Sequence, residues 1–157
     1  MRPLRVYLDT SVFGGCFDPP FQLDSLRILA AVREGRIVAL MSPLVADELA
    51  PAPEPVRQLL LGLPPSNIEP IDLDDEIREL RNAYLRAGIL DSKWRNDALH
   101  VAAATVARAD AILSWNFKHI VRLDKIKAFN AVNLYNGYGI LTILSPKECL
   151  IDDESED

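Results

Sequence analysis

The stretch that most constrains the fold runs from Asn96 to His119 and reads NDALHVAAATVARADAILSWNFKH. Its first half is rich in alanine and places Leu99 and Val106 at helical spacing, whereas residues 111–113 form a short apolar run. This change of period predicts a helix followed by a buried strand. Polar side chains then crowd the strand's end, within residues 114–119.

The rest of the chain alternates short apolar runs with segments of helical period. We expect a polar loop at 89–95 and a flexible connection at Gly14 and Gly15. Because parallel strands need crossover connections, the alternation predicts an α/β fold, a three-layer sandwich with a mostly parallel central sheet. The expected strands are 5–9, 37–41, 68–71, 111–113 and 140–144, and the expected helices are 23–32, 43–49, 54–61, 75–87, 97–106 and 126–134, with another helix starting at 145–148.

The chain's size and charge set its domain organisation and its partners. Its 157 residues suffice for a single domain, which we expect over 1–151, followed by an acidic disordered tail at 152–157. A net charge of −6 weighs against a nucleic-acid partner. Five of the 23 acids lie in the tail, however, which leaves 18 acids against 17 bases. Seven bases against three acids between residues 93 and 127 indicate a locally basic surface.

Cysteine usage and hydropathy indicate the compartment. Cys16 and Cys149 are far apart, no CxxC pair is present, and no charged-then-apolar leader precedes the first strand. We therefore expect a reduced, cytoplasmic protein. The longest apolar runs are far shorter than the ~20 residues that a membrane-spanning helix needs, so no membrane association is expected.

Four oxygen-bearing side chains are placed where this topology gathers ligands. Asp9 directly follows a predicted strand, Glu48 lies on a predicted helix, Asp97 opens the alanine-rich helix and Asn116 follows its strand. In parallel sheets, ligands bind beyond the carboxyl ends of the strands. Clustered carboxylates need a compensating cation, and oxygen ligands suit Mg²⁺ or Mn²⁺. The set therefore predicts a metal-dependent phosphoryl site.

Each of these residues also has a structural explanation. Asp97 fits a helix cap, Glu48 a solvated surface acid and Asn116 a turn residue. Asp9 is harder to explain in this way, because an acid after a buried strand must be hydrogen-bonded, paired or bound to metal. We interpret His100 and His119 as packed or exposed residues without a catalytic role, and Trp115 and Phe117 as packing residues.

Taken together, four segments of the chain resemble the PIN-domain nucleases, which include the toxin ribonucleases of the VapBC type. Residues 7–13 (YLDTSVF) resemble their first acidic motif, and residues 42–49 resemble the second, with Glu48 at its acid. Residues 96–104 (NDALHVAAA) resemble the third acid at the head of an alanine-rich helix, and residues 114–119 (SWNFKH) the final strand-end motif. The resemblance spans nearly the whole chain, to about Pro146.

The resemblance implies a PIN-like fold and hydrolysis of RNA phosphodiester bonds. Asp9, Glu48 and Asp97 would hold Mg²⁺ or Mn²⁺, and Asn116, where many members carry Asp, would orient water or complete the site. It further implies an RNA substrate, a cognate antitoxin and a homodimer. Supporting roles fall to Ser11 and Ser114, as donors that fix the carboxylates, and to Lys93, Arg95, Lys118 and Arg122, as contacts to the RNA backbone.

Two alternatives remain open at the level of sequence. The first is a catalytically weak or inactive PIN-like module that binds RNA or protein, with its site altered at Asn116. The second is a small-molecule phosphatase or phosphoacceptor that uses Asp9. Phosphatases of the haloacid dehalogenase type have a second acid two residues further on, where this chain has Ser11, and no GxxxxGK loop supports a nucleotide-binding enzyme.

Overall fold

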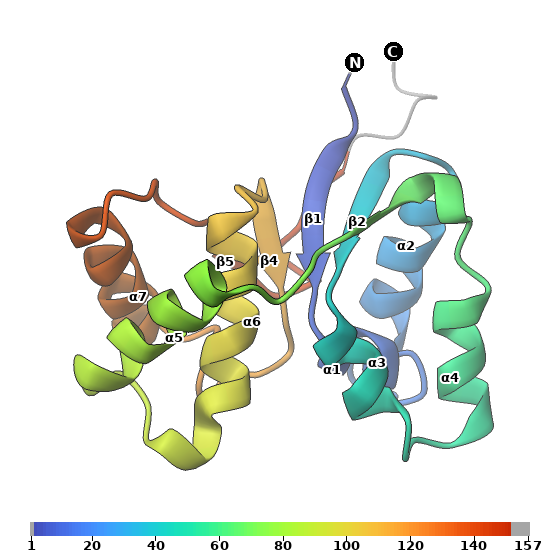
Figure 1. Cartoon of the computed structure of the whole chain (residues 1–157). Coiled ribbons are helices and arrows are strands. Elements are labelled where there is room, and N and C mark those ends of the chain that lie inside the picture. Colours follow the sequence, from blue (N-terminus) through green and yellow to red (C-terminus); the bar gives the residue numbers. More distant parts are fainter. Residues whose placement is uncertain (1, 152–157) are drawn as a thin grey trace.

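A computed structural model describes residues 2–151. Its centre is a five-stranded sheet in the order β3-β2-β1-β4-β5, in which every neighbouring pair is parallel (Figure 1). The predicted α/β sandwich is therefore confirmed, with a sheet that is parallel throughout. The strands are β1 (Leu4–Leu8), β2 (Ile37–Met41), β3 (Ile68–Pro70), β4 (Ala111–Leu113) and β5 (Ile143–Leu144).

Helices cover both faces of the sheet, as Figure 1 shows, with α1 to α4 on one side and α5 to α7 on the other. The helices are α1 (Thr10–Gly15), α2 (Gln22–Arg33), α3 (Pro43–Leu49), α4 (Glu54–Leu61), α5 (Asp75–Arg86), α6 (Arg95–Val106) and α7 (Leu123–Tyr135), with short 3-10 turns η1 (Pro65–Asn67) and η2 (Ser92–Trp94).

Each face of the sheet has its own apolar core, because successive side chains of a strand point to opposite faces. On β1, Tyr7 packs with the cluster of α5, α6 and α7, whereas Val6 and Leu8 pack with the cluster of α1 to α4. Strands buried on both sides read as continuous apolar runs, as β2 and β4 do. On α6, residues 101–104 are fully buried. The alanine-rich helix thus packs within the core, as its small side chains predict.

Two loops expected from the sequence are more ordered than predicted. Gly14 and Gly15 belong to α1, which follows β1 directly, and Asp9 caps this helix by accepting a hydrogen bond from the Ser11 backbone N–H. The 89–95 segment is not a polar loop, because Ile89 and Leu90 are each 6% exposed and η2 leads straight into α6. Gly15 in the first segment and Ile89 and Leu90 in the second are buried, which holds these parts of the chain in place.

The C-terminal elements differ from the prediction in length. Helix α7 is longer than expected, and β5 contains only Ile143–Leu144, since only this part pairs with β4. Residues 145–148 form a turn and no helix; the Ser145 hydroxyl donates to the Glu148 carboxylate. The predicted tail at 152–157 lies outside the described residues, and the single domain over 1–151 stays a prediction.

Both cysteines lie in the interior of the protein. Cys16 and Cys149 lie in the same apolar cluster, and both are buried free thiols. Burial raises the pKa of the Cys16 thiol to about 11, so that it stays protonated at neutral pH. Within residues 2–151, no helix has both the length and the apolar character to cross a membrane.

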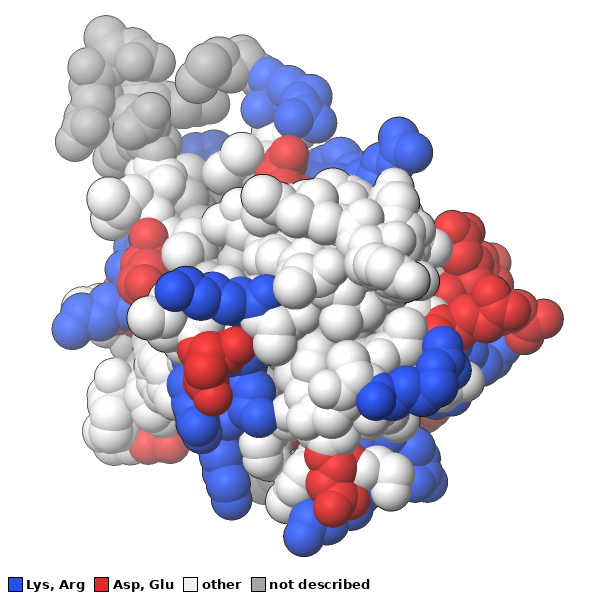
Figure 2. All heavy atoms as spheres, turned by 90° about the vertical axis from the view of Figure 1, so that its left-hand side faces the viewer, with Lys and Arg blue, Asp and Glu red and all other residues white. Residues whose placement is uncertain are grey.

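Charge is unevenly distributed over the face that carries α5 and α7. Figure 2 shows a broad uncharged area in the middle of this face and acidic side chains gathered at its right edge. Lys and Arg side chains lie near both the upper and the lower edge of this face, and an acidic group sits among the lower ones.

Candidate functional site

The candidate residues come from segments that meet at the carboxyl edge of the sheet. Asp9 follows β1, α3 with Glu48 follows β2, and Asn116 lies shortly after β4. Asp97 lies in the first turn of α6. The chain fills the sheet outward from β1 to β3 and then returns to place β4 on the other side of β1. Such a reversal of strand order opens a crevice at the carboxyl ends of the two strands.

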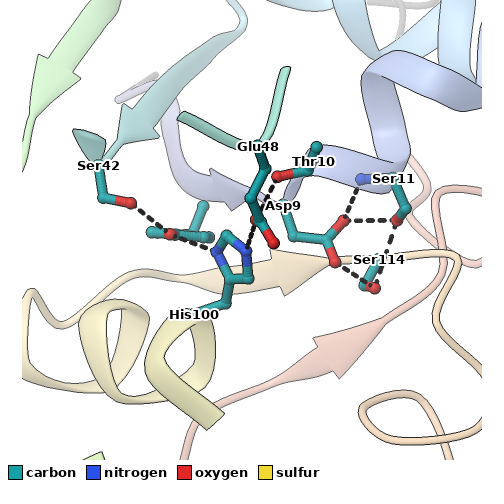
Figure 3. Close-up of polar contacts among 8 residues, drawn as sticks. Asp9, Thr10, Ser11, Ser42, Glu48, His100 and Ser114 are labelled. Carbon is teal, nitrogen blue, oxygen red and sulfur yellow. Dashed lines mark hydrogen bonds and ion pairs between the residues drawn. The ribbon is translucent and has the colours of Figure 1, made fainter. Parts of the chain in front are cut away.

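Asp9 is held in place by donors on both of its carboxylate oxygens (Figure 3). The Ser11 hydroxyl donates to Oδ1 at 2.5 Å, and the Ser114 hydroxyl donates to Oδ2 at 2.6 Å. Burial, which leaves the side chain 4% exposed, raises the pKa of Asp9, and the two serines and the nearby His100 oppose this rise. The two serines therefore make the contacts that were expected of them.

Glu48 accepts hydrogen bonds from two directions. The Thr10 hydroxyl donates to its Oε1 at 2.7 Å, and His100 Nε2 lies 2.6 Å from the same oxygen (Figure 3). His100 Nδ1 is in turn 2.7 Å from the Tyr7 hydroxyl. Burial opposes ionisation of Glu48, but the hydrogen bond and charge of His100 and the bond from Thr10 outweigh it, so the pKa of Glu48 lies below its ordinary value.

Asp97 and Asn116 are joined through His119. The Asp97 Oδ2 lies 2.8 Å from His119 Nδ1, and the Asn116 Oδ1 accepts from the His119 backbone N–H at 2.9 Å. The Asn116 backbone N–H donates at 2.9 Å to the Ser114 hydroxyl that holds Asp9. Asp97 therefore does not cap α6, whose N-cap residue is Trp94.

Hydrogen bonds link three of the four predicted residues. From Asp9 the chain of hydrogen bonds runs through Ser114, Asn116 and His119 to Asp97. On the other side, Thr10, the neighbour of Asp9 in sequence, donates to Glu48. Four segments distant in sequence thus form a polar network of two hydrogen-bonded groups, which adjoin where Thr10 follows Asp9.

Beside this network lies a pocket of about 510 Å³. Asp9, which is 4% exposed, is not among its lining residues. Of the four predicted RNA contacts, Lys93 and Lys118 line the pocket, whereas Arg95 does not and Arg122 pairs with Asp124 at 2.7 Å. The complete lining is Glu48, Lys93, Trp94, Asn96, Asp97, Asn116, Lys118 and His119.

The types of side chain at this site favour a metal ion, whereas their arrangement does not. Carboxylate and amide oxygens are the ligands that Mg²⁺ and Mn²⁺ prefer. Within residues 2–151, however, no three His, Cys, Asp or Glu side chains are grouped so that they could hold an ion. Glu48 and Asp97 are each engaged by a histidine. The chemistry of the residues fits the ion, but their side chains would have to move closer together to hold one.

Several residues of the network were missed from the sequence. His100 and His119 contact Glu48 and Asp97 directly and are not merely packing residues. A signal was present for His100, because it lies three positions after Asp97 and so on the same side of the helix. Ser42 is the N-cap residue of α3 but makes no side-chain capping bond, and its hydroxyl pairs with Tyr7 at 2.8 Å.

Comparisons with known proteins place the fold. No family model and no curated protein matches the sequence. Among solved structures, the chain is similar to one in the crystal structure of VapBC2 from Rickettsia felis bound to a DNA fragment from their promoter. The two chains share 17% identity over 89% of this chain and 97% of that one, with a TM-score of 0.55. This likeness shows a PIN-like fold, as the resemblance predicted.

Proposed function

We propose that this chain, which shares its fold with a chain of a VapBC complex, is a ribonuclease that hydrolyses RNA phosphodiester bonds with Mg²⁺ or Mn²⁺. The observation that carries the proposal is the polar network. It joins Asp9, Asn116 and Asp97 by hydrogen bonds and reaches Glu48 through Thr10, the residue next to Asp9, at the carboxyl edge of a parallel sheet. Acids are gathered in this way at the cost of mutual repulsion, which a cation relieves.

The proposed division of labour follows from the contacts. Asp9, Glu48 and Asp97 would hold the ion, which, when bound, lowers the pKa of a water molecule and neutralises charge on the phosphate. His100 and His119 position two of these carboxylates. The Asn116 carbonyl already accepts from His119, so its amide NH₂ group is the part that would contact water or substrate.

The proposal extends to a biological role as the toxin of a toxin–antitoxin pair. The support is the fold shared with VapBC2, a protein pair solved on a fragment of its promoter. We accordingly propose a cognate antitoxin as partner and a homodimer as the assembled state. Light scattering on the purified chain tests the dimer, and co-purification with the product of an adjacent small reading frame tests the antitoxin.

Cleavage of labelled RNA by the purified chain tests the enzymatic proposal. We expect cleavage with Mg²⁺ or Mn²⁺ and none in EDTA. Asp9→Asn and Asp97→Asn should each lower the rate by more than about 100-fold, because each removes a charge that would hold the ion. The matched control is Asp75→Asn, at a side chain that is 98% exposed on α5, and should cleave normally. Undiminished cleavage by both site variants would refute the proposal.

A second candidate function is a PIN-like module that binds RNA or protein without cutting it. The observation that favours it is the engagement of each carboxylate by donors, with no preformed group of three metal-binding side chains within residues 2–151. It predicts no cleavage and no rise in melting temperature with either metal, whereas ion binding to the folded state raises that temperature. A phosphatase is disfavoured, because both Asp9 oxygens are buried and hydrogen-bonded.

A further inference from the structure

Trp94 is placed unlike the other tryptophan of the chain. It ends η2 and is 38% exposed in the lining of the pocket. Trp115, by contrast, is 9% exposed, stacks on Phe21 with ring centroids 4.3 Å apart and donates from its indole N–H to Ser25. Packing in the interior therefore accounts for the position of Trp115 but not for the exposed position of Trp94.

Basic groups surround the Trp94 ring. The Nζ atoms of Lys93 and Lys118 lie 5.5 Å and 5.7 Å from its centroid, and the His119 ring lies 4.5 Å away at a tilt of 39°. An aromatic ring flanked by cations is how proteins bind single strands, since bases stack on the ring and phosphates pair with the cations. Lysine stems are flexible, so an ammonium group above the ring can give way to a base.

The ring shares its pocket with the candidate catalytic residues. Glu48, Asp97 and Asn116 line the same space, and His119 contacts both the Trp94 ring and Asp97. Two acids in a pocket repel a phosphate backbone, so binding there needs attraction from other groups. Stacking supplies an attraction that is independent of charge, and the two lysines supply the opposite charge.

We propose that Trp94 is the stacking platform for a nucleobase of single-stranded RNA, with Lys93 and Lys118 holding the adjacent phosphates. This inference rests on the proposed RNA substrate and adds the strand form that the pocket accepts. In a duplex each base face is covered by its neighbours, so a platform of this kind selects unpaired RNA. Trp94 is then a substrate-binding residue beside the acids.

Binding measured without metal tests the platform separately from cleavage. Fluorescence anisotropy of a labelled 12-nucleotide single-stranded RNA would be followed with the full chain in EDTA at low salt. We expect Trp94→Ala to weaken binding by about tenfold or more and Trp94→Phe by much less, because phenylalanine still stacks. Lys118→Ala should weaken binding and reduce its salt dependence. Tyr135→Ala, at a 91% exposed aromatic residue outside the pocket, is the matched control and should bind normally.

Tryptophan fluorescence distinguishes a base that stacks on Trp94 from an indirect effect in which Trp94 only packs against the His119 ring. RNA should quench the emission of the wild-type chain, and Trp94→Phe, which retains Trp115, should lose this quenching. Equal binding by Trp94→Ala, quenching that persists in Trp94→Phe, or equal affinity for a duplex would overturn the platform. If the chain still cleaves RNA when one of these three outcomes is found, only the platform is refuted and the nuclease proposal stands. Trp94-dependent binding without cleavage in Mg²⁺ or Mn²⁺ supports the platform and refutes the nuclease.

Discussion

Asp9 combines burial with three hydrogen bonds. Its oxygens accept from the hydroxyl and backbone N–H of Ser11 and from the hydroxyl of Ser114. Burial still raises its pKa, so ionisation of this carboxyl group opposes folding in the absence of a cation. Groups that are costly to fold but needed for chemistry are typical of functional sites. The physical state of Asp9 therefore supports a functional role more strongly than its place in the sequence did.

The close packing of Gly15 in α1 can be tested by comparison with its neighbour Gly14. A Cβ at Gly15 would lie 2.5 Å from the Ser25 hydroxyl oxygen and 2.7 Å from Trp115 Nε1, whereas a Cβ at Gly14 would meet nothing within 4 Å. We expect Gly15→Ala to lower the free energy of unfolding by about 1–3 kcal/mol through overpacking. Gly14→Ala should be neutral or stabilising by up to about 1 kcal/mol. Urea denaturation measures both, and equal effects would contradict the packing assigned to Gly15.

At the scale of elements, a buried polar cluster joins the three helices on one face of the sheet. The Tyr84 hydroxyl from α5 lies 3.3 Å from the Thr105 hydroxyl of α6 and donates to the Asn133 carbonyl of α7. Tyr84 and Asn133 are fully buried. Apolar packing alone permits helices to slide, whereas a buried hydrogen bond is satisfied in only one alignment. This cluster therefore sets the alignment of α5, α6 and α7.

Removal of the Tyr84 hydroxyl should destabilise the fold. We expect Tyr84→Phe to lower the free energy of unfolding by about 1–3 kcal/mol, because the Asn133 carbonyl loses its donor in a buried position. The matched control is Tyr138→Phe, whose hydroxyl donates to Glu76 at an exposed site. That change should cost less than about 1 kcal/mol. Thermal unfolding of both variants checks the difference, and a control as destabilised as Tyr84→Phe would rule out burial as the cause.

At the scale of the whole molecule, Arg5 ties together parts of the sheet that are not neighbours. From β1 its guanidinium crosses β2 to Glu69 of β3, with hydrogen bonds of 2.9 Å and 2.5 Å. The same side chain donates to the Ala107 and Arg108 carbonyls at the end of α6. The amino-terminal edge of the sheet is thus held by ion pairing, while the carboxyl-terminal edge carries the candidate site.

The Arg5–Glu69 pair should make stability depend on pH. The hydrogen bond and charge of Arg5 lower the pKa of Glu69 below its ordinary value of 4.5. The pair therefore stabilises the fold above pH 4.5, and this contribution is lost as pH falls through the lowered pKa. We expect Glu69→Gln to cost less than about 1 kcal/mol at pH 7, because solvent screens the pair.

The test of this pair is a comparison across pH. Urea denaturation at pH 7 and near pH 3 should show the gap between wild type and Glu69→Gln closing at the lower pH. Glu79→Gln, at an exposed position on α5, is the control and should show no comparable gap at either pH. A gap that widens on acidification would mean that the sign assigned to the pair is wrong.

Much of this architecture followed from local pattern. Helix α4 has the predicted bounds, Asp74 caps α5 through the Ile77 N–H, and Gly88 follows that helix with a φ of 75°. Apolar runs of the right length marked β2 and β4. Each of these signals acts between residues a few positions apart. For the same reason the signals failed at residues 89–95, where Ile89 and Leu90 are buried against distant apolar partners while residues 91–95 stay exposed.

By itself, the sequence determined the order of strands and helices, the class of the fold and the positions of the acids, because periodicity and turn chemistry are properties of neighbouring residues. Only the tertiary structure decided what each acid contacts. Glu48 meets His100 across 52 positions, and Asp97 meets His119 across 22. Such pairs form where crossover connections return separate helices and loops to one edge of the sheet, and no local pattern specifies which side chains will meet there.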